Sequence, residues 1–154
     1  MLEEFPVVAE VAVRWADMDA LGHVNHTRYL RYFEIARLEY LLRLGLDPPG
    51  ASWGEFGVII ASLDCRFLAP ITFPDTLSVG ARILSLAEDR CTMEHVAVSQ
   101  KLDRPAAQGT AVIVAYDYAA GRRRPLPLDV AQRIVALEGR EFHPEPEGDA
   151  LDRC

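Results

Sequence analysis

Two carboxylates and two imidazoles lie close together near the start of the chain. Asp17 and Asp19 precede Gly22, and His23 and His26 follow it. Carboxylates and imidazoles are the side chains that move protons in hydrolysis or bind a metal ion. A His-x-x-His spacing suits one helix face less well than an i, i+4 spacing. Proton transfer by a carboxylate is therefore the favoured interpretation, and a metal site is the alternative.

A change in hydrophobic period indicates which elements position these residues. Alternation of apolar and polar residues over Val7–Trp15 predicts a strand with one solvent-facing side. From Asn25 to Leu44 the pattern is helical, with Asn25 as the N-cap and Gly45 as the C-terminal stop. Asp19 is thus expected in a short turn between a strand and the N-terminus of a long helix.

Much of the surface of this helix is apolar, so other elements are expected to surround it. Four further strand-like segments follow, and their short polar connections favour antiparallel pairing. They are Gly57–Ile71, Thr76–Leu86, Cys91–Gln100 and Ala106–Tyr118. In the first of them, the side chains expected on the buried face are Ile59, Ala61, Leu63, Cys65 and Phe67. A short closing helix is predicted over Pro127–Glu138. The order predicts an α+β fold in which a five-stranded antiparallel sheet wraps one long central helix.

Length and composition indicate a single domain. The 154 residues are 50% hydrophobic and carry a net charge of -7, which argues against a nucleic acid as partner. The acidic start predicts no signal peptide, and no apolar run reaches the ~20 residues of a membrane span. Three scattered cysteines predict free thiols in the cytoplasm. We expect the domain over residues 1–139 and a disordered acidic tail over 140–154.

One long motif resembles a known family. Residues 17–26, followed by Tyr29, Tyr32-Phe33-Glu34 and Ala36-Arg37, resemble the hot-dog thioesterases of the 4-hydroxybenzoyl-CoA thioesterase and acyl-CoA thioester hydrolase type. The predicted element order is similar over residues 7–139. The resemblance implies a hot-dog fold, a homodimer or homotetramer with each site built across two subunits, and hydrolysis of acyl groups carried by coenzyme A or acyl carrier protein. It implies no metal and no other cofactor.

The resemblance also implies roles for individual residues. Asp19 matches the catalytic carboxylate, as general base or nucleophile, and the backbone N–H of His26 matches the oxyanion donor. A helix N-terminus suits that role because it presents unpaired N–H groups and a partial positive charge. Gly22 is expected to let the backbone of the turn approach the substrate. The residues expected to bind substrate are His23, Val24, Asn25 and Tyr29. Aroyl-specific members carry aromatic residues after this glycine, so the present sequence favours an aliphatic or other acyl group.

The remaining charged residues of the motif have two interpretations each. Asp17 is expected to be structural, with Arg14 as its partner, because Asp in a turn bonds its own backbone region. Glu34 is the reserve catalytic candidate, since other hot-dog branches use a helix glutamate. Its alternative role is a partly buried ion pair with Arg37 at i, i+3.

Two questions stay open at the level of sequence. The run Arg122–Arg124 predicts either a solvated basic turn or a contact with the phosphates of coenzyme A. Two other functions on the same fold are a module that binds acyl-CoA without turnover and an enoyl-CoA hydratase or dehydratase. The second of these rests on His23, which directly follows Gly22.

Overall fold

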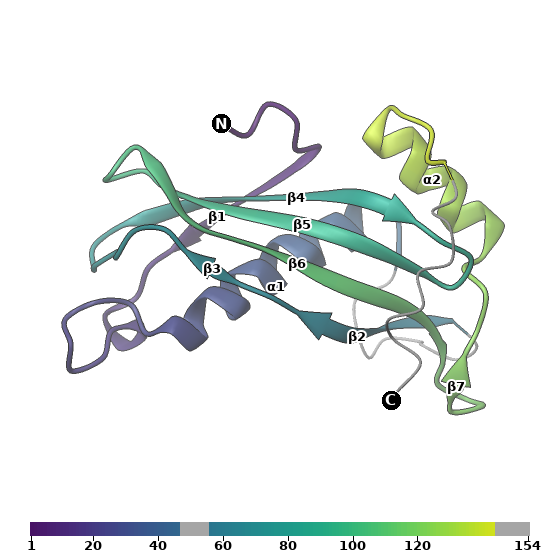
Figure 1. Ribbon diagram of the computed structural model, residues 1–154, viewed down its shortest axis with the longest axis horizontal. Coiled ribbons are helices and arrows are strands. Elements are labelled where there is room, and N and C mark those ends of the chain that lie inside the picture. The colour runs from purple at the N-terminus through teal and green to yellow at the C-terminus, as the bar shows by residue number, and fades with distance from the viewer. Residues whose placement is uncertain (47–55, 144–154) are drawn as a thin grey trace.

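The computed structural model describes residues 1–46 and 56–143, and one antiparallel sheet dominates it (Figure 1). The elements are β1 (Val7–Ala12), the 3-10 turn η1 (Trp15–Asp17), α1 (His26–Arg43), β2 (Gly57–Leu63), β3 (Arg66–Phe67), β4 (Thr76–Leu86), β5 (Arg90–Ser99), β6 (Arg104–Asp117), β7 (Arg122–Arg123) and α2 (Leu128–Glu138). The five long strands lie in the order β1-β4-β5-β6-β2, and the short strands β3 and β7 pair with β6. The predicted α+β fold is confirmed. Most of the predicted acidic tail, residues 144–154, lies outside the described residues.

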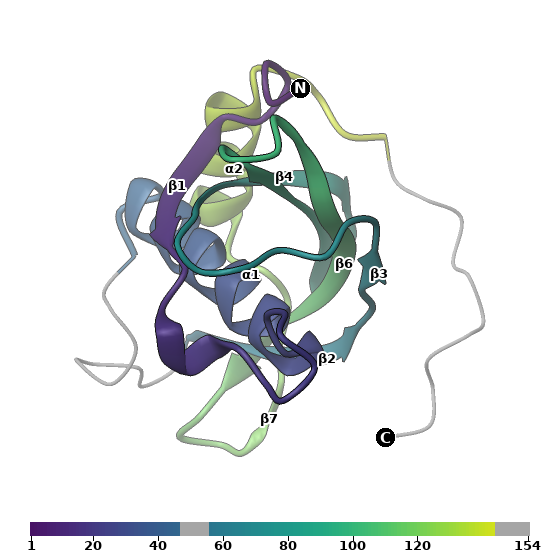
Figure 2. The same ribbon diagram turned by 90° about the vertical axis from the view of Figure 1, so that its left-hand side faces the viewer.

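The sheet curves around α1 (Figure 2). One stripe of the helix, formed by Tyr29, Phe33, Ala36 and Tyr40, is buried against the inner faces of β1, β4 and β5. The inner face of β4 is an alternating row of buried residues, Leu77, Val79, Ala81 and Ile83. The apolar residues spaced at the helical period in α1 therefore pack against those that alternate along the strands, and together they form one core.

The prediction for Gly57–Ile71 was wrong in two respects. The segment forms two strands, β2 and β3, rather than one, and its apolar residues do not all face the core. Ile59 and Leu63 are 41% and 42% exposed, whereas the alternate residues Val58 and Ile60 pack against the core. Exposure alternates without interruption along β2, with Ile59, Ala61 and Leu63 all exposed, so the predicted period was right and the predicted face was wrong.

A close backbone approach at Gly109 accompanies the break between β2 and β3. A Cβ added to Gly109 on β6 would lie 2.1 Å from the backbone oxygen of Asp64, which is much closer than any carbon–oxygen contact allows. Asp64 N–H donates to the carbonyl of Thr110 on the same strand. The chain can therefore pass from β2 to β3 in close contact with β6 because residue 109 has no side chain.

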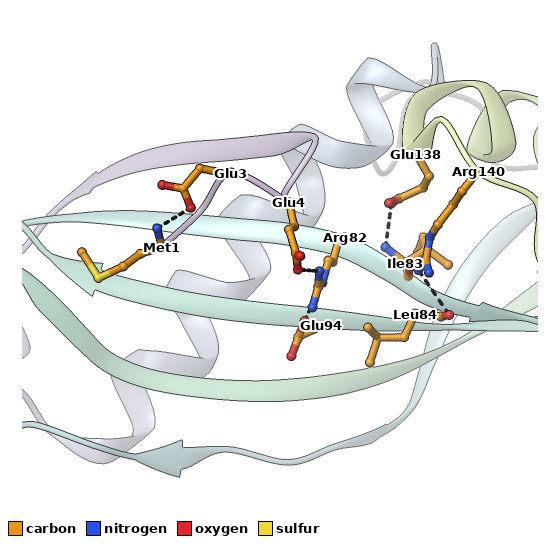
Figure 3. A network of polar contacts seen from close by, with 9 residues as sticks. All are labelled: Met1, Glu3, Glu4, Arg82, Ile83, Leu84, Glu94, Glu138 and Arg140. Atoms are coloured by element: carbon orange, nitrogen blue, oxygen red, sulfur yellow. Dashed lines mark hydrogen bonds and ion pairs between the residues drawn. The ribbon is translucent and has the colours of Figure 1, made fainter.

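The second helix closes one end of the sheet (Figure 3). The last β4 residue that pairs with β1 is Ala81, so Ile83 lies on an edge that β1 leaves open. Glu138 accepts a hydrogen bond from the Ile83 N–H at 2.6 Å, and Arg140 donates to the Ile83 carbonyl. These contacts satisfy backbone groups that an uncovered edge strand would expose.

Two buried polar side chains meet under the middle of α1. His95 on β5 is fully buried and stacks on Phe33 with ring centroids 5.1 Å apart, and neither ring nitrogen has a hydrogen-bond partner among the described residues. Arg37 is also buried and its Nη1 likewise has no partner there.

The predicted Glu34–Arg37 ion pair is wrong, because Glu34 accepts from Arg31 instead. Arg31 lies about one turn before Glu34 and is exposed to solvent. An ion pair with Arg31 therefore costs less desolvation than one with the buried Arg37.

Candidate active site

A tight turn between η1 and α1 carries the candidate catalytic carboxylate. The Asp19 N–H donates to the His23 carbonyl at 3.0 Å, and the Gly22 N–H donates to the Asp19 carbonyl at 3.0 Å. Gly22 has a φ of 80°, a conformation that L-residues with a side chain adopt only under strain. No atom of the described chain lies within 4 Å of a Cβ built on Gly22, so within this chain the requirement for glycine is conformational.

Both carboxylate oxygens of Asp19 are held by hydrogen bonds. Oδ1 accepts from the Leu21 N–H at 2.9 Å, and Oδ2 accepts from Nδ2 of Asn25 at 3.1 Å. The side chain is half-buried, so it is fixed by these donors and still accessible from one side. A carboxylate in this setting can accept a proton from a water molecule or attack an electrophilic carbon.

Asn25 joins this carboxylate to the N-terminus of α1. Its Oδ1 accepts from the Thr27 N–H at 3.0 Å and from the Thr27 hydroxyl at 2.7 Å, which confirms the predicted N-cap. The N–H of His26, the first residue of the helix, has no acceptor among the described residues and lies at the exposed surface. Unpaired N–H groups at a helix N-terminus attract negative charge. Asn25 therefore contacts the Asp19 carboxylate with its side chain and directly precedes His26, whose N–H is free to donate.

Asp17 lies beneath the turn and is 1% exposed. Arg14 donates to its carboxylate from the backbone N–H at 3.0 Å and from Nη2 at 3.1 Å, so the predicted Asp17–Arg14 contact is confirmed. The Tyr32 hydroxyl also donates to it, at 2.9 Å, and Arg28 Nε lies 3.8 Å away. Burial alone would raise the pKa of Asp17, but these hydrogen bonds and the Arg14 charge together lower it.

Tyr32 lies beside the candidate site, although the sequence indicated it only as part of the family motif. Its spacing from Tyr29 puts both tyrosines on neighbouring positions of one helix face, and their rings lie 6.0 Å apart. Phe67 was also missed as a neighbour of the site. Its ring contacts those of His26 and Tyr29, at 6.4 Å and 5.2 Å between centroids. Nothing in the sequence near Phe67 signals this contact, because 41 residues separate it from His26.

The other predicted substrate-binding residues differ in exposure. His23 is exposed and offers its side chain to solvent, whereas Val24 is buried and its N–H donates to the Ile71 carbonyl at 2.9 Å. Tyr29 is buried, and its hydroxyl lies 3.5 Å from the Ala69 carbonyl. Within one chain, Val24 and Tyr29 therefore anchor the turn and the helix, and their contacts with substrate stay predictions.

Two candidates lie away from the turn. Glu34 is eight residues along α1 from His26, or about 12 Å at 1.5 Å per residue, and pairs with Arg31. The basic residues Arg122 and Arg123 form β7 at the opposite end of the molecule from the turn (Figure 1). Of the predicted site residues, Asp19, Gly22, Asn25 and His26 are brought together within the described part of one chain, with the backbone of His23 in the same turn.

The described part of the chain offers no group of three or more His, Cys, Asp or Glu side chains that could hold a metal ion. No helix within residues 1–46 and 56–143 is long and apolar enough to cross a membrane. The arrangement instead pairs a fixed carboxylate with a helix amide that is free to donate a hydrogen bond. Such a pair suits attack on a carbonyl carbon, because the amide stabilises the negative charge that develops on the carbonyl oxygen.

Comparison with known proteins gives the same reaction class. The family model of the thioesterase-like superfamily matches residues 13–134. A thioesterase from Thermus thermophilus, solved with coenzyme A and Zn, is 38% identical, with a TM-score of 0.79 over 91% of this chain and 99% of that one. BH1999 gentisyl-coenzyme A thioesterase is 26% identical, with a TM-score of 0.74 over 82% and 98% of the two chains.

A curated plant enzyme is similar along most of the sequence as well. The chloroplastic acyl-acyl carrier protein thioesterase ATL3 of Arabidopsis thaliana is 27% identical over 136 residues, which are 87% of this chain and 70% of that protein. The family match spans well over half of the residues and includes the turn, α1 and every strand of the curved sheet except β1. The chain therefore belongs to the thioesterase-like superfamily, and its class of activity is the hydrolysis of thioesters.

Proposed function

We propose that the protein hydrolyses acyl-coenzyme A thioesters, with Asp19 as the catalytic carboxylate and the His26 N–H as the oxyanion donor. The observation that carries this proposal is the hydrogen bond from Asn25 to Asp19 Oδ2, because the same asparagine caps the helix whose first amide is His26. The carboxylate and the amide are thereby fixed relative to each other. Similarity to a thioesterase solved with coenzyme A supports this carrier.

The reaction at this site balances without a cofactor. In the general-base route, Asp19 accepts a proton from water while the water oxygen attacks the thioester carbon. The carbonyl oxygen takes up the displaced electron pair and accepts a hydrogen bond from the His26 N–H. Collapse of the tetrahedral intermediate breaks the C–S bond, and the thiolate of coenzyme A leaves and receives the proton. In the nucleophilic route, an Asp19 oxygen attacks the thioester carbon and the C–S bond breaks, so the thiolate of coenzyme A leaves and takes up a proton, and water then hydrolyses the mixed anhydride.

The proposal is tested by the release of free thiol from a series of short, medium, long and aromatic acyl-CoAs. Asp19→Asn keeps the size of the side chain and removes its ability to accept a proton or attack. We expect kcat to fall by about a thousandfold or more in this variant, with an unchanged circular dichroism spectrum and melting temperature. Wild-type kcat in Asp19→Asn would refute the assignment of Asp19, and enoyl-CoA hydration without thiol release would refute the hydrolase.

A single turnover in H₂¹⁸O distinguishes the two routes. With enzyme in excess, a general-base mechanism places ¹⁸O only in the released acid. A mixed anhydride can be opened by water at either carbonyl, and opening at the Asp19 carbonyl leaves ¹⁸O in the enzyme. Mass spectrometry of the peptide that contains Asp19 therefore detects the nucleophilic route directly.

We also propose that two copies pair along β2. Among the described residues, β2 pairs with β6 on one side and has no partner strand on the other. Ile59, Leu63 and Phe67 are exposed along this edge, and Phe67 contacts His26 at the site. An open apolar edge strand is a template for pairing with a second strand. A two-fold pair would therefore cover the apolar edge next to each active site.

Light scattering tests the pairing and gives the number of chains in the particle. Ile59→Arg should lower the measured mass to that of one chain and lower activity with it, since a buried unpaired charge opposes association. Leu84→Arg is the matched control, because Leu84 is an exposed leucine on β4, away from this edge. Loss of association in both variants, or in neither, contradicts pairing along β2.

A further inference from the structure

A second layer of polar contacts lies below the candidate catalytic residues. The Tyr32 hydroxyl, one turn and a half into α1, donates to Oδ2 of the buried Asp17 carboxylate at 2.9 Å. The same oxygen also accepts from the Arg14 N–H at 3.0 Å. Burial and the neighbouring Asp17 carboxylate raise the pKa of Tyr32, so the hydroxyl remains a donor at neutral pH.

The backbone carbonyl of Asp17 connects this carboxylate to Asn25, and through Asn25 to Asp19. This carbonyl accepts the Asn25 N–H at 2.8 Å, directly before the first residue of α1. Asn25 in turn donates to Asp19 at 3.1 Å and accepts from the Thr27 N–H at 3.0 Å. A continuous set of hydrogen bonds thus runs from Tyr32 through Asp17 and Asn25 to the Asp19 carboxylate.

We infer that Tyr32 is a positioning residue for the reaction, which acts through Asp17 and Asn25 and does not touch the substrate. The inference rests on the proposed function, because it assumes that Asp19 and the His26 amide act on one carbonyl. Asp17 joins the turn to the side of α1, and Tyr32 is its donor on the helix. Without the hydroxyl, the Asp17 carboxylate loses its hydrogen bond to the side of the helix and, among the described residues, keeps there only the longer contact with Arg28, at 3.8 Å.

The energetic argument concerns a buried carboxylate that loses a donor. A carboxylate out of water is stable only when its oxygens accept hydrogen bonds, so Asp17 is expected to tilt toward the remaining donors or toward water. Because the Asp17 carbonyl holds Asn25, such a tilt moves the N-cap and the Asp19 carboxylate together. A displacement of about 1 Å at a reacting group can cost up to about a hundredfold in rate.

The same helix offers a matched control. Tyr40 is another buried tyrosine of α1, and its hydroxyl donates to a carboxylate, that of Glu138, at 2.7 Å. Tyr32→Phe and Tyr40→Phe therefore remove the same group from the same helix, and each deprives one carboxylate of one donor. Only the first of these carboxylates is connected to Asp19. A purely structural role for both tyrosines predicts loss of stability in both variants and loss of kcat in neither.

The experiment measures kcat, KM and melting temperature for both variants with the acyl-CoA that the thiol-release screen identifies. We expect Tyr32→Phe to lower kcat about five- to twentyfold with KM changed less than about twofold, and Tyr40→Phe to retain kcat within about twofold. Equal kcat values for wild type and Tyr32→Phe overturn the inference. If Tyr32→Phe does not fold, Arg14→Gln removes a surface donor to the same carboxylate and should lower kcat in the same direction.

A double-mutant cycle tests the route through Asn25. If Tyr32 acts through this residue, Tyr32→Phe lowers kcat less than about twofold in an Asn25→Ala background, whereas independent effects multiply. Multiplied losses overturn the route. Asp19→Asn distinguishes the two proposals: if it has wild-type kcat, the proposed catalytic role of Asp19 fails, and if it is inactive while Tyr32→Phe equals wild type, only the positioning role fails.

Discussion

The two ends of α1 are built in opposite ways. At the N-terminal end, the His26 amide has no acceptor among the described residues, and the adjoining turn holds a half-buried carboxylate. At the C-terminal end, Gly45 and Leu46 donate to carbonyls of the last turn, and Arg133 of α2 donates to the Leu44 carbonyl at 3.0 Å. One end therefore keeps polar groups available, and the other satisfies them.

The C-terminal end of α1 also packs against α2 and the sheet. Tyr40 and Glu138 are hydrogen-bonded there, and an apolar cavity of about 20 Å³ lies between α1, the sheet and α2. Among the described residues this cavity is lined by Leu44, Met93 and Val130 with other apolar side chains. A single helix thus differs along its length: amides at one end are free to donate, and polar groups at the other end are satisfied and hold the fold.

Removal of the Glu138 side chain should destabilise the C-terminal end of α1. Glu138→Ala leaves the Ile83 N–H and the Tyr40 hydroxyl without their acceptor, and each buried unsatisfied group costs about 1–3 kcal/mol. We expect the free energy of unfolding to fall by about 3 kcal/mol in urea titrations. The kcat of the folded fraction should stay at its wild-type value. A fall in kcat without a fall in stability would contradict the separation of the two ends.

Acid should destabilise the region between the two ends. Burial, and secondarily the charge of Arg37, lower the pKa of His95 to about 3. The unfolded chain, with a His pKa of about 6.5, therefore binds a proton that the folded chain refuses, and stability falls by up to about 1.4 kcal/mol per pH unit as pH drops from about 6.5 towards 3. The loss from this group is absent above pH 6.5.

His95→Leu removes this titration and packs a similar volume against Phe33. Compared with wild type, the variant should resist acid by about 2 kcal/mol at pH 5 relative to pH 7, as measured by urea unfolding at both pH values. Parallel pH profiles of stability for the two proteins would show that His95 does not stay neutral in the fold.

Changes at Asn25 should sharpen the description of the functional end. Asn25→Ala removes the N-cap and the donor to Asp19, whereas Asn25→Asp keeps a cap acceptor, removes the donor and places a second carboxylate beside Asp19. We expect both variants to lose kcat by about tenfold, or about 1.4 kcal/mol. Only Asn25→Ala should also lower the free energy of unfolding, by about 1 kcal/mol. Full kcat in Asn25→Asp would show that the hydrogen bond to Asp19 is not needed.

Filling the cavity should give the smallest effect. Val130→Ile on α2 adds one methylene group to the apolar lining, and burial of a methylene contributes about 0.8 kcal/mol. The melting temperature should rise by about 2–3 °C for a chain of this size, with kcat and KM unchanged. A lower melting temperature would mean that the cavity cannot accept the group without strain.

Local signals in the sequence predicted much of the architecture. The N-cap at Asn25 and the stop at Gly45 bound α1 correctly, and the alternation of Thr76–Leu86 gave the bounds of β4 to the residue. The Asp17–Arg14 contact was also predicted, because its partners are three residues apart. These features depend on neighbours in sequence, and their hydrogen bonds or periodicities are visible in a short window.

Local sequence specified the helix α1, the turn before it and the carboxylate at position 19. Long-range packing was needed to bring Tyr32 to Asp17, to place Phe67 against His26, and to turn Ile59 and Leu63 outward. The physical reason is that a short window specifies backbone conformation and which side chains alternate. Which of the two alternating faces is buried depends on how the strand pairs in the sheet and on the side from which α1 packs, and neither is specified within a short window.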